Sequence, residues 1–501
     1  MLTAHTIDLL SPDFPLLSEY HGQTVLISGN NNLPNDKERP QVYYAHNVLP
    51  TTEGYQSIGY EQLLPRTIYT DITTTVTVYE SAFSRVANLI FSASGKLHVA
   101  YLDSTEWLEI AAPADIQGRL ITKALVRGVT YIYFSGLGCY RYDFGSNSLV
   151  AVTLTALSTS SILGIVGNSG YLLAYGNDGS VAWSSTVDTT DFTPSLITGA
   201  GSGRLDGALG KTIVAVSVAN GIIFFNEKNA VACLYQDNIK YPFSFTPIPG
   251  SGGLVSADNT ITNALDSQAA YAYTTSGLQA VTVSGAQPIL PRVSDFLAGK
   301  ALETFNEDTN ALESITPVAT LKKKLAWIAD RYLIISYGDG LLSHAIVFDI
   351  YLGRLGKLKV DHVDIFEFNL YLNTIYDAPR KSIGVIKRDG TLSVVNPDTA
   401  YAASSGVLIL GKYQLTKERF SNLLSVLVEN IPAAATFNIY DLPTYDGKSF
   451  YGSPLAGHDS GQLGVAKKYY FSSVAKAHTL LCKGRFNLVS GQINLEIAGD
   501  Q

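Results

Sequence analysis

The chain has 501 residues, 46% of them hydrophobic and 16% charged, which excludes a disordered segment and is enough to bury several cores. Lys and Arg number 35 against 43 Asp and Glu, so the formal charge is −8. A net acidic chain with few cations is poorly suited to binding nucleic acid or an anionic membrane, because both require clustered Lys and Arg. Cys139, Cys233 and Cys482 are too dispersed for a disulfide framework or a zinc site, and we expect three buried side chains.

Residues 1–70 are predicted to form an exposed N-terminal arm with long loops. The run SGNNNLPNDKERPQ (residues 28–41) is polar, charged and rich in Asn and Pro, as loops are. The first residues, MLTAHTIDLL, lack the basic start and apolar core of a secretion signal. No stretch of about eighteen uncharged apolar residues occurs, so we expect no membrane insertion.

Residues 71–405 are dominated by strand signals. Short runs rich in β-branched and aromatic residues indicate strands, among them TVTVYE, KLHVAYL, YIYFS, YLLAYG, IIFF, LIISYG and AIVFDIY. Helical spacing is scarce, and the two best helix candidates are residues 116–128 and 294–305. The chain is therefore expected to be all-β with a small amount of helix.

The strands of this region come in pairs around a turn. Turns that join two apolar runs are centred on Gly95, Gly138, Gly179, Lys228–Asn229, Gly277, Gly340 and Gly390. They recur at intervals of 41 to 63 residues, close to the size of a four-stranded propeller blade. We predict a β-propeller-like body of about six to seven blades, and a stacked array of β-sandwiches is the alternative.

Residues 406–501 are predicted to form a separate C-terminal β-domain, a small sandwich or barrel. About five strands are visible: LLSVLVENI, TFNIYDL, KKYYFSSV, HTLLCKGRFNLV and QINLEIA. Nine Lys and Arg against seven Asp and Glu give residues 411–501 a charge of +2, so the rest of the chain carries −10. The acidity therefore belongs to the propeller-like body and the arm.

No motif of an enzyme, metal or cofactor site is found, and we predict no catalytic residue, no metal ligand and no cofactor. GAGSGRLDG (residues 199–207) is glycine-rich, but a phosphate cradle needs a helix directly after it, so we predict a flexible loop. In DHVD (residues 361–364), Asp361 and His362 would face opposite sides of a strand, and a solvated strand end is expected. The turn at residues 175–183 has a Gly and a Trp, as turns of sialidase-like propellers do, but it lacks their Ser and Asp, so a structural turn is expected.

Three segments of the sequence resemble the tail nozzle, tail hub or stabilisation proteins of short-tailed bacteriophages. The first, AHNVLPTTEGYQSIGY (residues 45–60), has an Asn-x-Leu-Pro phrase followed by Gly-Tyr. The second, residues 181–233, contains a Trp-Ser strand, an Asp-Phe-x-Pro turn and a strand with a Gly-hydrophobic-x-Phe-x-Glu pattern; the matching positions are Trp183, Ser184, Asp191, Phe192, Pro194, Gly221, Ile222, Phe224 or Phe225, and Glu227. The third, AHTLLCKGRFNLVSGQINLEI (residues 477–497), has a His-bearing strand, a Lys-Gly turn and a Phe-x-Leu strand.

This resemblance implies a non-enzymatic, structural virion protein that is made in the host cytoplasm. Such proteins form homo-oligomeric rings, expected here to be hexameric, that extend the DNA-ejection channel. The partners implied are a portal- or adaptor-side tail protein and tail fibres or spikes, while DNA passes through without being bound tightly. The cation-poor composition is compatible with a conduit, because each Lys or Arg contact to phosphate would retain the DNA.

Two alternatives remain at this stage. A carbohydrate-binding or carbohydrate-cleaving β-propeller would show a pocket lined by Trp and paired carboxylates, and the chain has only Trp107, Trp183 and Trp327. A secreted or surface scaffold protein that is not viral is disfavoured by the missing secretion signal.

Overall fold

The computed structural model describes most of the chain. The described residues are 5–8, 41–52, 54–63, 72–80, 85–101, 107–261, 268–299, 302–306, 311–315, 321–328, 331–370, 380–388, 391–396, 406–413, 415, 419–431, 436–445, 454–463 and 466–498. Among these residues, no helix has the length and apolarity that crossing a bilayer requires.

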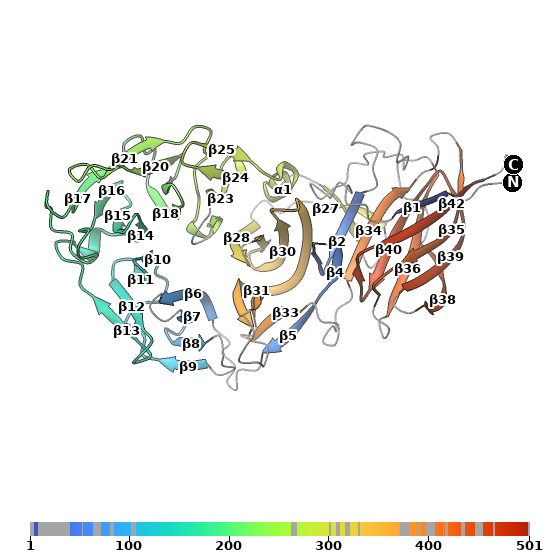
Figure 1. Cartoon of the computed structure of the whole chain (residues 1–501), viewed down its shortest axis with the longest axis horizontal. Helices are drawn as coiled ribbons and strands as arrows, with labels where there is room; N and C mark the ends of the chain where they lie inside the picture. Colours follow the sequence, from blue (N-terminus) through green and yellow to red (C-terminus); the bar gives the residue numbers. More distant parts are fainter. Residues whose placement is uncertain are drawn as a thin grey trace.

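In the part of the chain that the structure describes, seven units of four antiparallel strands lie in a circle and form a β-propeller (Figure 1), so the predicted all-β, propeller-like fold is confirmed. Blade 1 consists of β6 (Ile72–Glu80), β7 (Arg85–Ser92), β8 (Leu97–Tyr101) and β9 (Trp107–Ile110). Blade 2 consists of β10 (Ile121–Val126), β11 (Val129–Phe134), β12 (Gly138–Asp143) and β13 (Ser148–Val152). Blade 3 consists of β14 (Gly164–Asn168), β15 (Tyr171–Tyr175), β16 (Ser180–Trp183) and β17 (Gly201–Arg204). Blade 4 consists of β18 (Thr212–Val218), β19 (Gly221–Asn226), β20 (Ala230–Tyr235) and β21 (Phe243–Pro247). Blade 5 is β22 (Thr260–Ile261), β23 (Ala270–Thr274), β24 (Gly277–Thr282) and β25 (Gly285–Pro288).

The last two blades share one long strand. Blade 6 consists of β28 (Leu321–Ile328), β29 (Tyr332–Asp339), β30 (Leu342–Asp349) and the first part of β31 (Arg354–Leu370). Blade 7 consists of the second part of β31 with β32 (Arg380–Lys387), β33 (Leu392–Asn396) and β5 (Gly59–Leu63). The circle closes where β31 contacts β6 of blade 1.

The middle strands of the blades are continuously apolar because they are covered on both faces. All five residues of β15 and all six of β19 are buried. Side chains from alternate faces of these strands enter different hydrophobic clusters, each shared with a neighbouring blade. Face-to-face packing of blades therefore replaces the alternation of apolar and polar residues that a one-sided sheet would show.

The C-terminal domain is a β-sandwich of two five-stranded sheets. One sheet has the order β1 (His5–Asp8), β42 (Gly491–Ile497), β35 (Ser421–Val428), β39 (Ala466–Ala475) and β38 (His458–Leu463). The other has the order β2 (Gln41–His46), β34 (Gly406–Tyr413), β40 (Ala477–Gly484), β36 (Phe437–Thr444) and β37 (Leu455–Ala456). The five predicted strands of this domain correspond to β35, β36, β39, β40 and β42, and they enclose one apolar core.

The described strands of residues 1–70 differ from the arm that we predicted. β1 pairs with β42 and β2 with β34, so this segment supplies one edge strand to each sheet of the sandwich. β5 pairs with β33 and is the outer strand of blade 7. The polar run at residues 28–40 lies outside the described residues. The described parts of the segment are therefore integral to both domains.

The two helix predictions have different outcomes. Residues 116–128 do not form a helix: they contain a turn and β10, which pairs along its whole length with β11. Alternating burial along β10 shows that its apolar residues follow the strand period, which the short window could not distinguish from a helical one. Residues 294–305 overlap α1 (Pro291–Leu297), which starts with Pro at its first turn, and their end lies in β26 (Leu302–Asn306), paired with β27 (Ala311–Ile315).

The predicted turns fall between paired strands. Gly95, Gly179, Gly277 and Gly340 all have φ between +68° and +96°, the left-handed region that glycine adopts without strain. Lys228 and Asn229 connect β19 to β20, and Gly138 is the first residue of β12. Gly390 lies outside the described residues, between β32 and β33.

Candidate functional site

The DHVD segment lies inside β31, and its burial contradicts the solvated strand end that we predicted. His362 and Asp364 are 2% and 3% exposed, whereas the Asp361 side chain is 65% exposed. The pairing with β32 shifts register between His362 and Asp364. This bulge stands where β31 passes from blade 6 to blade 7, which places both side chains among the inner strands of the ring.

Asp364 connects three blades at the point where the propeller closes. One carboxylate oxygen lies 2.8 Å from Lys324 Nζ on β28, and the other accepts hydrogen bonds from the backbone N–H and hydroxyl of Thr75 on β6, at 3.2 and 3.4 Å. Burial acts to lower the pKa of Lys324, but the carboxylates of Asp364 and Asp258 outweigh it and raise that pKa. The lysine is therefore held in its charged form, and the group of three side chains ties the last blades to the first.

His362 and Ser336 form a buried pair beside this network. His362 Nε2 lies 2.9 Å from Ser336 Oγ, and its Nδ1 lies 2.7 Å from the Val360 carbonyl oxygen. Burial lowers the pKa of His362, although Asp364 acts in the opposite direction. A serine with a histidine is the beginning of a nucleophile–base arrangement, but both residues are almost fully buried. A substrate therefore cannot reach the pair, and the two side chains contribute to the packing of the core.

A second histidine with a carboxylate partner joins the two sheets of the sandwich. His478 Nδ1 lies 2.8 Å from Asp441 Oδ2, and its Nε2 lies 3.0 Å from the backbone carbonyl oxygen of Ser421. Both side chains are completely buried, and the Ser421 hydroxyl donates to the Ala475 carbonyl instead. No nucleophile faces this histidine among the described residues, so the pair reads as a structural cross-link.

Basic residues gather where blade 6 meets β2. His344 on β30 pairs directly with Lys359 on β31, two positions from Lys357. Burial, together with the two lysines, lowers the pKa of both His46 and His344 to about 3. Burial and Lys359 also lower the pKa of Lys357 to about 8. Both histidines are therefore neutral near pH 7.

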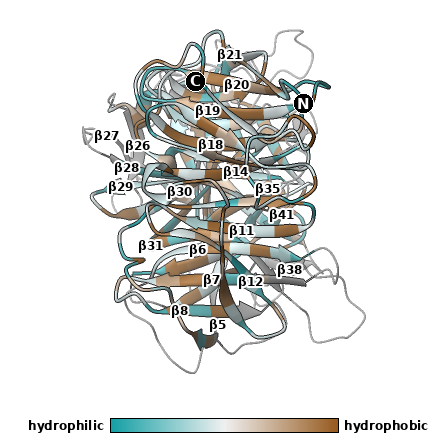
Figure 2. Ribbon diagram, turned by 90° about the vertical axis from the view of Figure 1, so that its left-hand side faces the viewer, coloured by the Kyte–Doolittle hydropathy of each residue, from teal (hydrophilic) through white to brown (hydrophobic). Residues whose placement is uncertain are grey.

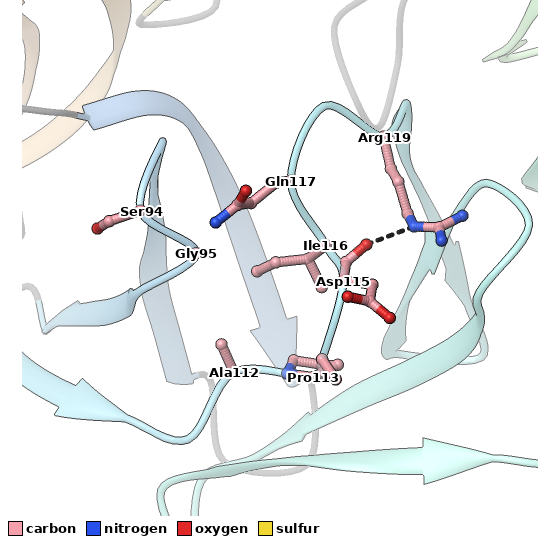
Figure 3. A pocket seen from close by; sticks show the side chains of 9 residues that line it. Ser94, Gly95, Ala112, Pro113, Asp115, Ile116, Gln117 and Arg119 are labelled. Atoms are coloured by element: carbon pink, nitrogen blue, oxygen red, sulfur yellow. Dashed lines mark hydrogen bonds between the residues drawn. The ribbon is translucent and has the colours of Figure 1, made fainter.

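A cavity lies between a turn of blade 1 and the connection from blade 1 to blade 2. Its volume is about 550 Å³, and its lining residues are Ser94, Gly95, Ala112, Pro113, Ala114, Asp115, Ile116, Gln117 and Arg119. Figure 3 shows how the side chains surround it. The Arg119 guanidinium donates hydrogen bonds to the backbone carbonyls of Asp115 and Ser135. The lining includes one carboxylate and no Trp, so it lacks the features expected of a carbohydrate site.

The glycine-rich segment at residues 199–207 is a strand in its middle, not the flexible loop that we predicted. Gly201 and Gly203 lie in β17 and face the indole of Trp183, which a side chain at Gly201 would approach to 3.1 Å. Trp183 Nε1 donates to the Gly199 carbonyl at 2.8 Å. Glycine at these positions is therefore explained by the Trp183 ring, which packs closely on the strand, and not by the binding of a phosphate.

The remaining sequence candidates are structural. In the 175–183 turn, Asp178 accepts hydrogen bonds from the backbone and side chain of Ser180, as an ordinary turn does. Cys139, Cys233 and Cys482 are free and buried, as predicted. Burial raises the pKa of Cys139 and Cys482 to about 12, so neither is a reactive thiolate. Within the described part of the chain, no group of three or more potential ligands is placed to hold a metal ion.

The junction between propeller and sandwich is built from chain segments far apart in sequence. β3 (Val48–Pro50) pairs with both β31 and β4 (Tyr55–Ser57), and β4 pairs with β41 (Asn487–Leu488). Ser57 and Phe486 exchange hydrogen bonds: Ser57 N–H donates to the Phe486 carbonyl and Phe486 N–H to Ser57 Oγ, at 2.9 and 2.8 Å. A Cβ at Gly54 would lie 2.0 Å from the Leu488 carbonyl oxygen, so only glycine allows this approach.

Side chains of blade 6 hold the same junction from the propeller side. Arg354 is buried and donates to the Thr51 carbonyl at 2.9 Å, with its guanidinium 5.9 Å from the centre of the Tyr55 ring. Tyr332 Oη donates to the Pro50 carbonyl at 3.0 Å. Because buried hydrogen bonds and a completely buried Tyr55 connect the domains, we describe the junction as a fixed connection.

Comparisons with known proteins give fold neighbours only. No family model and no curated protein matches the sequence. Among solved structures, the chain is similar to the WD40 β-propeller domain of Doa1, with 11% identity, 69% of this chain and 99% of that chain covered, and a TM-score of 0.39. It is also similar to the computationally designed Ika8 protein (12% identity, 67% and 99% covered, TM-score 0.37) and to BamB from Moraxella catarrhalis (12% identity, 70% and 96% covered, TM-score 0.34). The propeller assignment rests on the strand pairing given above and not on these likenesses.

Proposed function

We propose that this protein is a structural component of a bacteriophage tail, a nozzle or hub subunit that forms a ring and extends the DNA-ejection channel. Its neighbours would be a portal- or adaptor-side tail protein and tail fibres or spikes. In this role the chain has no catalytic task and is part of the virion.

One observation carries the proposal. Two of the three segments that resemble nozzle proteins, residues 45–60 and 477–497, are separated by more than four hundred residues, yet they pair through β4 and β41. Tyr55 of the first segment pairs with Leu488 of the second, and Gly54 lies against the Leu488 carbonyl oxygen. Their resemblance therefore concerns one three-dimensional element, the fixed connection between the domains, which supports a common architecture.

The middle segment, residues 181–233, supports the proposal in a similar way. Trp183 covers the glycines of β17, Phe192 is 3% exposed, and Phe224 and Phe225 are completely buried. These residues build blades 3 and 4, so the resemblance again concerns architecture and no catalytic group. A structural role is what such a pattern favours.

Assembly on the preceding layer of the tail provides the test. The protein would be co-purified with the portal- and adaptor-type proteins encoded beside it, and the mass of the complex measured by mass photometry. We expect several copies of this chain per complex, six in the simplest case, and a ring by electron microscopy. A single copy per complex, or no complex together with saturable binding to a glycan, would contradict the proposal and favour the carbohydrate-binding alternative.

A further inference from the structure

The chain contains a single Asn-Gly dipeptide, Asn220–Gly221, and the structure places it at the tip of a hairpin. The hairpin consists of β18 and β19 of blade 4, whose ladder ends with the pair of Val218 and Gly221. Two residues, Ala219 and Asn220, form the loop between the strands, and both are exposed to solvent. The Asn220 side chain is therefore in contact with water at the point where the chain reverses direction.

Amide side chains connect this hairpin tip to the blades on either side of it in the sequence. Asn168, the last residue of β14 in blade 3, donates through Nδ2 to the carbonyl oxygens of Val218 and Gly221, at 3.2 and 3.0 Å. Asn220 Nδ2 donates to Gln268 Oε1 at 2.7 Å, shortly before β23 of blade 5 begins. Figure 2 shows β18 and β19 beside β14. The hairpin tip thus connects three successive blades.

Packing requires glycine at position 221. A Cβ there would lie 2.6 Å from the Cys233 carbonyl oxygen of β20 and 3.3 Å from Val283 Cγ1 of blade 5, and the first of these distances is too short for a real contact. Glycine has no side chain to cover its own backbone nitrogen, which is the atom that follows the Asn220 carbonyl. The fold therefore places an uncovered nitrogen directly after an exposed asparagine.

We propose that Asn220 is a site of spontaneous deamidation in the folded protein. Hydroxide removes the Gly221 amide proton, and the nitrogen attacks Asn220 Cγ to form a five-membered succinimide ring. The Cγ–Nδ2 bond breaks, and the leaving nitrogen takes up a proton and departs as ammonia. Water then opens the ring at either of its two carbonyl carbons, giving aspartate or isoaspartate. The sum is asparagine plus water to an acid plus ammonia, with no oxidation or reduction.

Sequence and exposure together distinguish Asn220 from other asparagines of the propeller. Asn226, at the other end of β19, is completely buried, accepts a hydrogen bond from the Thr212 hydroxyl at 3.0 Å and is followed by Glu227. Asn177 is exposed, but it is followed by an aspartate, whose side chain hinders attack by its own nitrogen. Asparagine is a thermolabile residue in general, and here exposure and the following glycine coincide at one position. This chemistry is independent of the proposed tail function.

Deamidation would alter the connection between the three blades. A carboxylate has no hydrogen to donate, so the hydrogen bond from residue 220 to Gln268 Oε1 is lost. Isoaspartate also lengthens the main chain by one atom between Ala219 and Gly221, directly at the last pair of the β18–β19 ladder. We therefore expect the isoaspartyl form to unfold at a lower temperature than the unmodified protein.

Incubation of the folded, full-length protein in a mildly alkaline buffer tests the proposal. Trypsin cuts after Lys211 and Lys228 and releases residues 212–228, a peptide that contains both Asn220 and Asn226. Fragmentation in a mass spectrometer assigns the mass increase from amide to acid to one of the two positions, and an isoaspartyl methyltransferase assay measures isoaspartate. We expect conversion at Asn220 that is faster at higher pH, and none at Asn226 over the same time.

Three controls make the result decisive. A sample digested at the start of the incubation corrects for conversion during digestion. Asn220→Gln should give no conversion, because its longer side chain would have to close a less favoured six-membered ring. The same protein unfolded in guanidinium chloride gives the rate without the fold. Conversion of Asn220 in the unfolded but not in the folded protein would overturn the proposal, and so would equal conversion of Asn226 in the folded protein.

Discussion

At the scale of single residues, Asp364 shows how a propeller without sequence repeats can close its ring. Its carboxylate reaches Lys324 of blade 6 and Thr75 of blade 1 while standing on the strand that begins blade 7. A buried ion pair contributes little net stability compared with apolar packing, but removing one partner leaves a buried charge. The pair therefore fixes which strands meet at the closure more than it strengthens the fold.

Replacement of this carboxylate gives the first prediction. Asp364→Asn keeps an acceptor for Thr75 but leaves the charge of Lys324 without its closest carboxylate, and we expect the free energy of unfolding to fall by about 3 kcal/mol. Urea denaturation followed by tryptophan fluorescence measures the change. Asp361→Asn is the control, since Asp361 is exposed and lies 3.9 Å from Arg388 at the surface. Equal effects of the two substitutions would contradict a special role for Asp364.

The neutral histidines at the junction give a prediction about pH. The pKa of His46 and His344 is about 3 in the folded protein, against an ordinary value of 6.5. Below pH 6.5 the unfolded chain binds protons that the folded chain excludes, so the free energy of unfolding falls as the pH decreases from about 6.5 to about 3. The groups that face these histidines, Lys357, Lys359 and His362, are basic and reinforce the effect.

Denaturation series at several pH values would measure this dependence. The double variant His46→Gln with His344→Gln should show a flatter decline between pH 6.5 and pH 3 than the wild type. His458→Gln, at an exposed position on β38, should leave the decline unchanged. A double variant with the slope of the wild type would contradict the assignment of the pH dependence to the junction.

At the scale of elements, the sequence predicts local structure well where turns are explicit. Gly95, Gly179, Gly277 and Gly340 mark hairpins because their positive φ is a local requirement. Residues 121–126 form a strand and not part of the predicted helix, because their few apolar residues fit both the helical and the strand period and pairing with β11 decides between the two. Burial of His362 and Asp364 depends on a bulge in β31 and on strands of other blades, which local patterns do not encode.

The largest difference between sequence and structure concerns the N-terminal segment. Nothing in β5 indicates that it pairs with β33, which lies more than three hundred residues later, or that β1 pairs with β42 near the other end of the chain. Pairing at such sequence separation is decided by the global topology. An exposed arm was therefore the natural interpretation of a polar, Asn- and Pro-rich stretch.

Truncation distinguishes an arm from an integral segment. A chain that begins at residue 71 would leave blade 7 without its outer strand and each sheet of the sandwich without one edge strand. We expect this chain to be insoluble or rapidly digested by a nonspecific protease, whereas loss of a free arm would leave a protease-resistant body. Adding residues 1–70 as a separate peptide should restore part of the resistance, and a stable, cooperatively unfolding truncated chain would contradict the pairing.

At the scale of the whole molecule, the distribution of charge and the fixed domain junction belong together. Residues 411–501 carry +2 and the remainder −10, and the junction holds these two parts in one orientation. Assembly of rigid, polarised subunits places the same part of each subunit on the same side of a ring. A ring built in this way has one acidic zone and one nearly neutral zone.

The charge distribution leads to the last prediction, which concerns DNA. Each phosphate contact made by Lys or Arg adds affinity that depends on salt, and several such contacts in a lumen would stall a moving duplex. A propeller that carries most of the −10 charge should repel phosphate, so we expect no retention of duplex DNA by the isolated protein in filter binding at micromolar concentration and moderate salt. The described basic residues that work against this include the group near β2 and Lys322, Lys323 and Lys324 on β28. Burial lowers the pKa of Lys357 to about 8 and that of both histidines near β2 to about 3, and Lys324 is paired with Asp364, so we expect these groups to add little affinity for a duplex. Clear retention of DNA that weakens steeply with added salt would contradict the conduit hypothesis. Loss of that retention in Lys357→Gln with Lys359→Gln would then locate the binding at the junction and point to a protein that holds nucleic acid.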